Sequence, residues 1–142
     1  MKKILIINAN YYKNISYNLI KDAKKKLANH KIKLNFINVP GIFEIPIAIR
    51  KNVKKYDGFI ALGCVIKGDT PHFDLICMSV FNAILKISID FNKPIANGII
   101  TALNLSQAIA RSSLDKKTKK PNKGSEAANA VLSILNNEPK KI

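Results

Sequence analysis

Residues 63–74 are Gly-Cys-Val-Ile-Lys-Gly-Asp-Thr-Pro-His-Phe-Asp, and this stretch decides the fold. It closes an apolar run, turns through a glycine loop and opens a helical pattern. Thr70 is predicted to cap that helix, and Pro71 to start it, because proline lacks the N–H that the first turn cannot use. The free amides and the dipole of such a helix start favour anions. The segment therefore predicts a phosphate site beside His72.

Short apolar runs and helical patterns alternate outward from this segment. Strands are expected at residues 4–9, 32–39, 59–66 and 95–100, and helices at residues 16–28, 43–55, 71–91, 106–112 and 123–135. Apolar runs separated by helices are typical of a parallel sheet covered on both faces. The prediction is an α/β fold, a flavodoxin-like three-layer α/β/α sandwich around a four-stranded parallel sheet, in a single domain over residues 1–142. Order is expected to break at residues 114–121, where charge and proline replace periodicity.

The net charge of +15 raises the question of nucleic acid. The basic residues argue against it, because all but Arg50 and Arg111 are lysines, whereas base and phosphate recognition favours the guanidinium fork. The excess charge is interpreted as solvated surface, including the loop cluster Lys116, Lys117, Lys119 and Lys120.

The cysteines and the start of the chain bound the remaining classes. Cys64 and Cys77 do not have the spacing of a metal site, and no metal is expected. No run approaches the ~18 apolar residues that cross a bilayer, and Met1 leads directly into a strand without a signal peptide's apolar region. A cytoplasmic protein is expected.

The residues that follow each strand form a coherent set, since ligands of open parallel sheets gather beyond the carboxyl ends of the strands. Tyr11 follows the first strand, residues 40–44 the second, residues 64–72 the third and Thr101 the fourth. The expected rim therefore offers an aromatic face, a carboxylate, an anion loop and an imidazole.

The helix expected at residues 71–91 is apolar around most of its circumference. Leu75, Met78, Phe81, Leu85 and Ile89 extend beyond one stripe. Such a helix requires cover beyond its own sheet, which predicts a homo-oligomer. An unusually wide core face is the alternative.

Four blocks make the chain resemble the 6,7-dimethyl-8-ribityllumazine synthase family. They are residues 39–46 (VPGIFEIP), 61–74 (ALGCVIKGDTPHFD), 107–111 (QAIAR) and 122–124 (NKG). The resemblance covers nearly the whole chain. It implies a transferase of riboflavin biosynthesis that condenses 5-amino-6-(D-ribitylamino)uracil with 3,4-dihydroxy-2-butanone 4-phosphate, without metal or organic cofactor. It leaves open any association with riboflavin synthase.

The resemblance also implies a role for each matching residue. His72 would be the catalytic proton shuttle. The aminouracil and its ribityl chain would be bound by Tyr11, Ile42, Phe43, Glu44, Cys64, Val65, Ile66 and Asn97. The butanone phosphate would be bound by Gly68, Asp69 and Thr70, with Arg111 and Lys123 from a neighbouring subunit. Taken singly, each has a structural alternative, such as helix capping for His72 or dipole compensation for Arg111 and Glu44.

Two departures from the family bear on these expectations. Asn97 stands where many relatives have an aromatic side chain, at the end of the fourth strand, and it can donate hydrogen bonds but cannot stack. A long lysine-rich connection separates Arg111 from Lys123, and it would obstruct packing between pentamers. A homopentamer is expected rather than a sixty-subunit shell.

Two other classes of function stay open at this level. A flavodoxin-like module could bind a flavin or ribityl compound without turning it over. A basic nucleic-acid-binding protein is the other alternative, and it would show steeply salt-dependent binding.

Overall fold

The computed structural model describes residues 1–117 and 120–142. The elements in chain order are β1 (Lys2–Ala9), α1 (Lys13–Leu27), β2 (Ile32–Val39), the 3-10 turn η1 (Ile42–Glu44), α2 (Ile45–Asn52), β3 (Gly58–Ile66), α3 (His72–Phe91), β4 (Ile95–Ala102), α4 (Leu105–Ser112) and α5 (Lys123–Leu135). Lys119 of the lysine cluster, and part of the predicted break in order at 114–121, lie outside the described residues.

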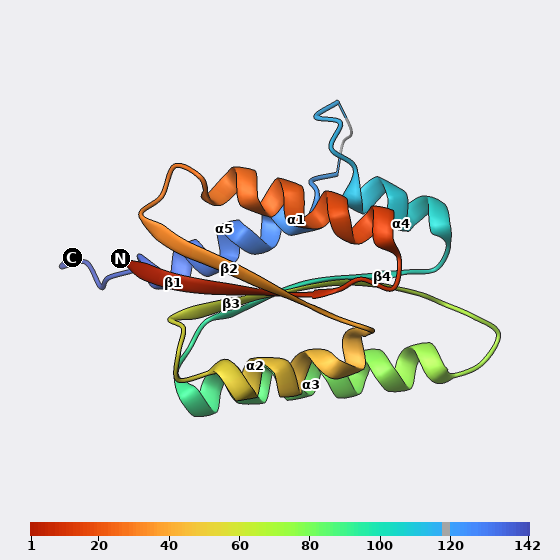
Figure 1. The fold of residues 1–142 in the computed structure, drawn as a ribbon, viewed down its shortest axis with the longest axis horizontal. Helices are drawn as coiled ribbons and strands as arrows, with labels where there is room; N and C mark the ends of the chain where they lie inside the picture. The colour runs from red at the N-terminus through yellow and green to blue at the C-terminus, as the bar shows by residue number, and fades with distance from the viewer. Residues whose placement is uncertain (118–119) are drawn as a thin grey trace.

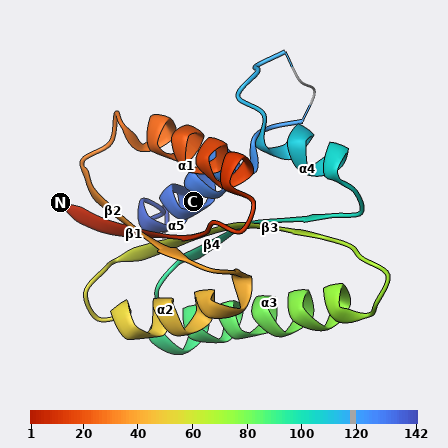
Figure 2. The same ribbon diagram turned by 45° about the vertical axis from the view of Figure 1, so that its right-hand side comes forward.

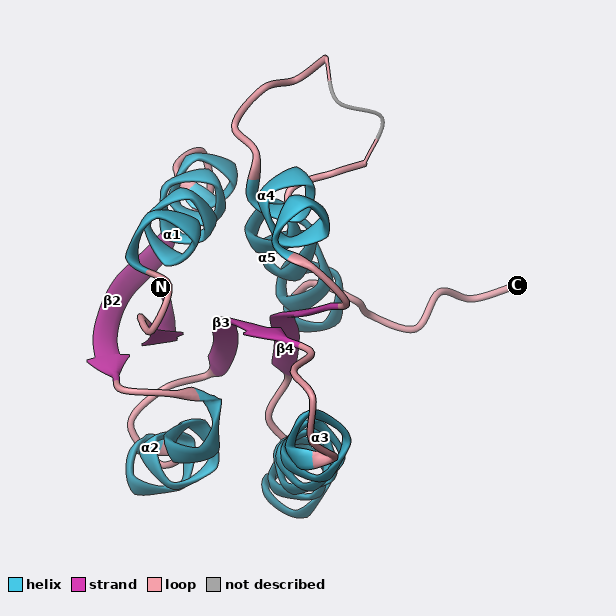
Figure 3. Ribbon diagram, turned by 90° about the vertical axis from the view of Figure 1, so that its right-hand side faces the viewer, coloured by secondary structure: helices cyan, strands magenta, loops and turns pink. Residues whose placement is uncertain are grey.

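The described strands form one four-stranded parallel sheet in the order β2-β1-β3-β4. Helices α1, α4 and α5 cover one face, and α2 and α3 cover the other (Figures 1 and 3). The central strand β1 is buried on both faces because its side chains are apolar without alternation, from Ile4 to Ile7. The prediction of a flavodoxin-like three-layer sandwich is confirmed.

The parallel arrangement brings every strand's carboxyl end to the same edge of the sheet. The connections from β3 to α3 and from β4 to α4 leave the sheet at that end (Figures 1 and 2). Both chain termini lie at the other end (Figure 1). Loops that are distant in sequence are therefore neighbours in space.

Helix α5 approaches α1 very closely at Gly124. A Cβ on this glycine would collide with the carbonyl oxygen of Leu19, which is main chain and cannot rotate away. The N–H of Gly124 donates to the carboxamide of Asn122 (2.8 Å), which caps α5. The missing side chain thus sets the distance between the two helices.

Several predicted boundaries differ from the structure. Thr70 does not cap α3: the helix begins at His72, its N-cap is Pro71, and this N-cap makes no side-chain hydrogen bond to the helix. The helix expected at residues 43–55 is split into η1 and α2. Strand β4 continues to Ala102, so Thr101 lies within the strand rather than beyond it.

Helix α3 contradicts the expectation that no segment is long enough to cross a bilayer. The helix has 20 residues, and an 18-residue window within it has a mean hydropathy of 1.4, which is sufficient by length and composition alone. Only 17% of that window is buried. Cys77, Val80 and Ile84 face the sheet. The outer face exposes Leu75, Met78, Leu85 and Ile89 to 59–70%. One chain alone therefore leaves much of α3 uncovered.

Replacing Gly124 with alanine is expected to lower the free energy of unfolding by about 1–3 kcal/mol, because α5 must move away from α1. Gly68→Ala is the matched control, since nothing lies within 4 Å of its added Cβ. Chemical denaturation of both variants measures the difference. Equal midpoints for the two would contradict the close approach.

Candidate active site

Tyr11 and Phe43 place exposed aromatic faces at the carboxyl edge of the sheet. Tyr11 follows β1 and is 75% exposed, while Phe43 in η1 is 65% exposed. The rings of Tyr11 and Tyr12 are in T-shaped contact, with their centroids 5.0 Å apart. Tyr12 in turn packs against the core, so Tyr11 is held beside a fixed ring while most of its own surface is open to solvent. Such a face can stack on a flat ring.

The last residues of β3 extend beyond its neighbour β1. The pairing of β1 with β3 ends at Asn8 and Leu62, whereas β3 and β4 remain paired up to Ile66 and Ala102. Backbone groups of Cys64, Val65 and Ile66 that point away from β4 therefore have no strand opposite them in the described sheet. They can exchange hydrogen bonds with the polar edge of a ligand.

Gly63 brings the second strand's loop onto this overhang. A Cβ at Gly63 would come within 2.9 Å of the Ile42 side chain and 3.0 Å of Ala9. Ile42 is buried beside it, and Glu44, two residues on, is half-buried at the same edge. The missing side chain thus lets residues 42–44 lie against the end of β3.

The loop from β3 to α3 is open to solvent. Gly68, Asp69, Thr70 and His72 are all exposed, and His72 forms no hydrogen bond with the described residues. The first backbone bond of α3 joins the N–H of Leu75 to Pro71 O (3.2 Å), which leaves the preceding amides of the first turn available to an anion.

Cys64 is a poor nucleophile despite its position at this edge. Burial raises the pKa of its thiol to about 11, so the thiol is neutral at physiological pH. Its contribution to a site is confined to backbone groups and packing.

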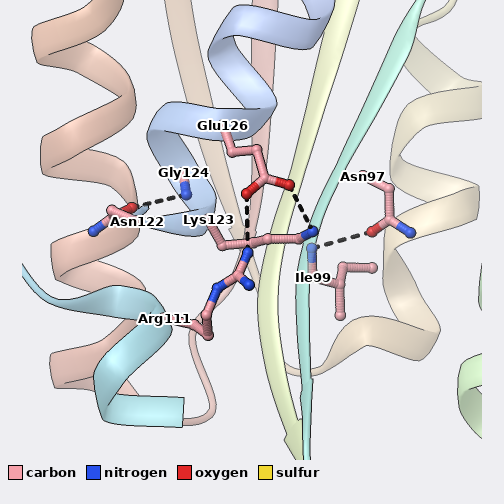
Figure 4. Close-up of polar contacts among 7 residues, drawn as sticks. All are labelled: Asn97, Ile99, Arg111, Asn122, Lys123, Gly124 and Glu126. Carbon is pink, nitrogen blue, oxygen red and sulfur yellow. Dashed lines mark hydrogen bonds and ion pairs between the residues drawn. The ribbon is translucent and has the colours of Figure 1, made fainter. Parts of the chain in front are cut away.

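The predicted phosphate ligands Arg111 and Lys123 come together around a third residue. Arg111 Nη2 lies 2.9 Å from Glu126 Oε2, and Lys123 Nζ lies 3.2 Å from Glu126 Oε1 (Figure 4). The Nε of Arg111 is buried without a partner among the described residues. This cluster carries two cations and one carboxylate.

Asn122 fixes the backbone that carries these cations. It is only 6% exposed, and its Nδ2 donates to the carbonyls of Ser112 (3.0 Å) and Ser113 (3.2 Å) while its Oδ1 caps α5. One side chain therefore ties the end of α4, next to Arg111, to the start of α5, at Lys123.

Asn97 is not at the end of the fourth strand, as expected, but is the third residue of β4. Its Oδ1 accepts a hydrogen bond from the N–H of Ile99 (3.1 Å; Figure 4). Since β4 is the last strand of the sheet, this bond satisfies a backbone donor on the side of β4 that faces away from β3. Its Nδ2 donates no hydrogen bond to the described residues, and Asn97 is exposed. Asn97 is therefore a hydrogen-bond donor on the β4 edge.

Within one chain these residues form two groups that do not meet. The first group lies around the carboxyl ends of the strands and consists of Tyr11, residues 42–44, residues 64–66 and residues 68–72. His72 is the first residue of α3, in the helical layer on one face of the sheet. Arg111 and Lys123 lie in the opposite helical layer, on α4 and α5 (Figure 3). None of the hollows described on the single chain is lined by His72 or Arg111.

Glu126 was not predicted from the sequence to be a partner of these cations. The signal was available, because Glu126 is three residues beyond Lys123, and side chains at this spacing on a helix are neighbours. Its contact with Arg111, 15 residues away, depends on the packing of α4 beside α5.

A known protein family matches nearly the whole chain, including all residues of the candidate site. The model of the 6,7-dimethyl-8-ribityllumazine synthase family matches residues 1–138. The chain is 40% identical to the 6,7-dimethyl-8-ribityllumazine synthase of Leuconostoc mesenteroides, over 95% of this chain and 87% of the relative. It is 38% identical to the enzymes of the same name from Bartonella tribocorum (93% and 87% covered) and Campylobacter jejuni (94% and 88% covered). The chain belongs to the 6,7-dimethyl-8-ribityllumazine synthase family.

Proposed function

We propose that this chain condenses 5-amino-6-(D-ribitylamino)uracil with 3,4-dihydroxy-2-butanone 4-phosphate, giving 6,7-dimethyl-8-ribityllumazine, phosphate and water in riboflavin biosynthesis. The observation that carries the proposal is the family match over residues 1–138, which includes every residue of the candidate site. The neutral Cys64 thiol offers no covalent route, so the chemistry falls to substrate positioning and proton transfer.

The aminouracil is held by the carboxyl edge of one chain. Its ring stacks on the exposed face of Tyr11, and its polar edge pairs with the overhanging backbone of residues 64–66. The ribityl hydroxyls bond to residues 42–44, where the Glu44 carboxylate accepts. Gly63 supports this arrangement because it lets Ile42 approach β3 closely.

The butanone phosphate lies over Gly68, Asp69 and Thr70 at the open start of α3. The free amides there contact the phosphate, while the Asp69 carboxylate points to solvent or toward Lys67. Arg111 and Lys123 approach from an adjacent subunit, because within one chain they lie in the other helical layer. Asn97, on the outer edge of β4, offers its Nδ2 donor to the neighbour's pyrimidine.

His72 moves the protons. Imine formation, phosphate elimination and ring closure each transfer protons, and the exposed imidazole of His72 can accept or donate a proton at the open start of α3. Holding the two substrates together contributes further, a term that can reach ~7–11 kcal/mol.

The assembly that completes these sites is a pentamer in the cytoplasm. The apolar outer face of α3, with Leu75, Met78, Leu85 and Ile89, supplies surface for contacts between copies. The long connection between α4 and α5 favours isolated pentamers, because it would obstruct contacts between them.

Replacing His72 with alanine is expected to slow lumazine formation by ~10- to 1000-fold without abolishing it, since positioning is retained. The KM of each substrate changes little. Lumazine fluorescence from both substrates measures the rate. His30→Ala is the control, because His30 lies in the connection between α1 and the start of β2, at the end of the sheet opposite the strands' carboxyl ends. Full activity of the His72 variant would reject its role.

Mixing two defective variants tests whether a site is shared between subunits. His72→Ala and Arg111→Ala are each expected to lose most activity alone. In hybrids refolded from an equal mixture, about a quarter of the shared sites combine an intact His72 with an intact neighbouring Arg111. Activity should therefore rise above that of either parent. A mixture no more active than its parents would contradict a shared site.

Light scattering is expected to give a particle mass five times the 15.8 kDa of one chain. Leu85→Glu should shift the mass toward smaller species, because it puts a charge on the outer face of α3. Lys86→Glu on the same helix is the matched control, since Lys86 is already charged and 76% exposed. A monomer or a sixty-subunit mass for the wild type would exclude the pentamer.

A further inference from the structure

Glu126 lies between Arg111 and Lys123, the two cations assigned to the substrate phosphate, and it has no assigned part in substrate binding or catalysis. It is in the first turn of α5, where a carboxylate is favoured by the helix dipole. Each of its oxygens contacts a different cation, Arg111 at 2.9 Å and Lys123 at 3.2 Å. A carboxylate beside a phosphate site is unexpected, because it repels a dianion.

Glu126 could either block the two cations from binding a phosphate or hold them in position for it. The N–H donors that it leaves free on Arg111 and Lys123 distinguish these two roles. A guanidinium has five N–H donors and an ammonium has three. Glu126 occupies one donor on each partner. Arg111 and Lys123 therefore keep donors for a phosphate while both remain in contact with Glu126.

The solvent exposure of Glu126 indicates that its carboxylate repels a bound phosphate only weakly. The Glu126 side chain is 45% exposed, so water and salt screen its charge toward a ligand. The Arg111 and Lys123 side chains are 29% and 27% exposed. Both are long side chains that lose rotamer freedom when they bind a ligand, and their like charges repel each other. A carboxylate in direct contact with both offsets these costs before the ligand arrives.

We propose that Glu126 is a positioning residue that holds Arg111 and Lys123 together as one phosphate-binding unit. This inference rests on the proposed function, because it takes the phosphate of the butanone substrate as the ligand of these cations. Glu126 acts through its two partners and does not touch the reacting atoms. Its loss weakens phosphate binding although it removes a negative charge.

The test compares phosphate binding in the wild type, Glu126→Ala and Glu126→Gln. We expect the Kd of inorganic phosphate, measured by calorimetry, and the KM of the butanone phosphate to rise by about tenfold in Glu126→Ala. The rise is smaller in Glu126→Gln, which keeps one oxygen acceptor. The kcat and the KM of the aminouracil change little. Glu138→Gln, which removes an exposed carboxylate from the tail after α5, should leave every value unchanged.

Phosphate binding that is tighter or unchanged in Glu126→Ala would overturn the inference, since the carboxylate would then be a competitor or idle. A lower unfolding midpoint with an equal rise in both KM values would also overturn it, because a structural role would suffice. Failure of the proposed function would give a different result, because the wild type would then form no lumazine. Calorimetry with inorganic phosphate would still show whether loss of the Glu126 carboxylate weakens phosphate binding.

Discussion

The candidate site depends on burial of the parallel sheet on both faces. Because each strand is followed by a helix that crosses back over the sheet, every strand must end at the same edge. Tyr11, residues 42–44 and the loop before α3 are neighbours for that reason alone. The glycine at position 63 and the overhang of β3 then shape the edge, leaving backbone groups beside an aromatic ring. The proposed chemistry thus occupies positions that the described part of the fold leaves without partners.

The same constraint explains why one chain does not enclose a site. Helices α3 and α5 belong to opposite layers, so His72 and the Arg111 cluster cannot share a cleft within one sandwich. Two features that are costly in a monomer acquire a use in the proposed assembly. In that proposed assembly a copy covers the exposed apolar face of α3. There Arg111, whose Nε is buried without a partner in the described part of the chain, reaches a ligand held by a neighbour.

Arg111 and Lys123 differ from the many other cations of the chain in how firmly they are held in place. Most lysines stand on solvated faces, where charge contributes little specificity. Arg111 and Lys123 differ because Asn122 fixes the backbone on both sides of them and Glu126 contacts both side chains. Position, rather than net charge, makes them suitable for a phosphate.

The sequence by itself determined the layer architecture, the order of strands and helices along the chain, and the family, because hydrophobic periodicity and local motifs are written in consecutive residues. It also located Tyr11, Glu44 and His72 at one edge. The tertiary structure alone decided what depends on contacts between distant segments. Glu126 meets Arg111 only when α4 packs beside α5, and Asn97 lies along the β4 edge because the strand continues to Ala102. Thr70 does not cap α3 because the helix begins at His72 and its N-cap is Pro71, one residue later than the local pattern predicts.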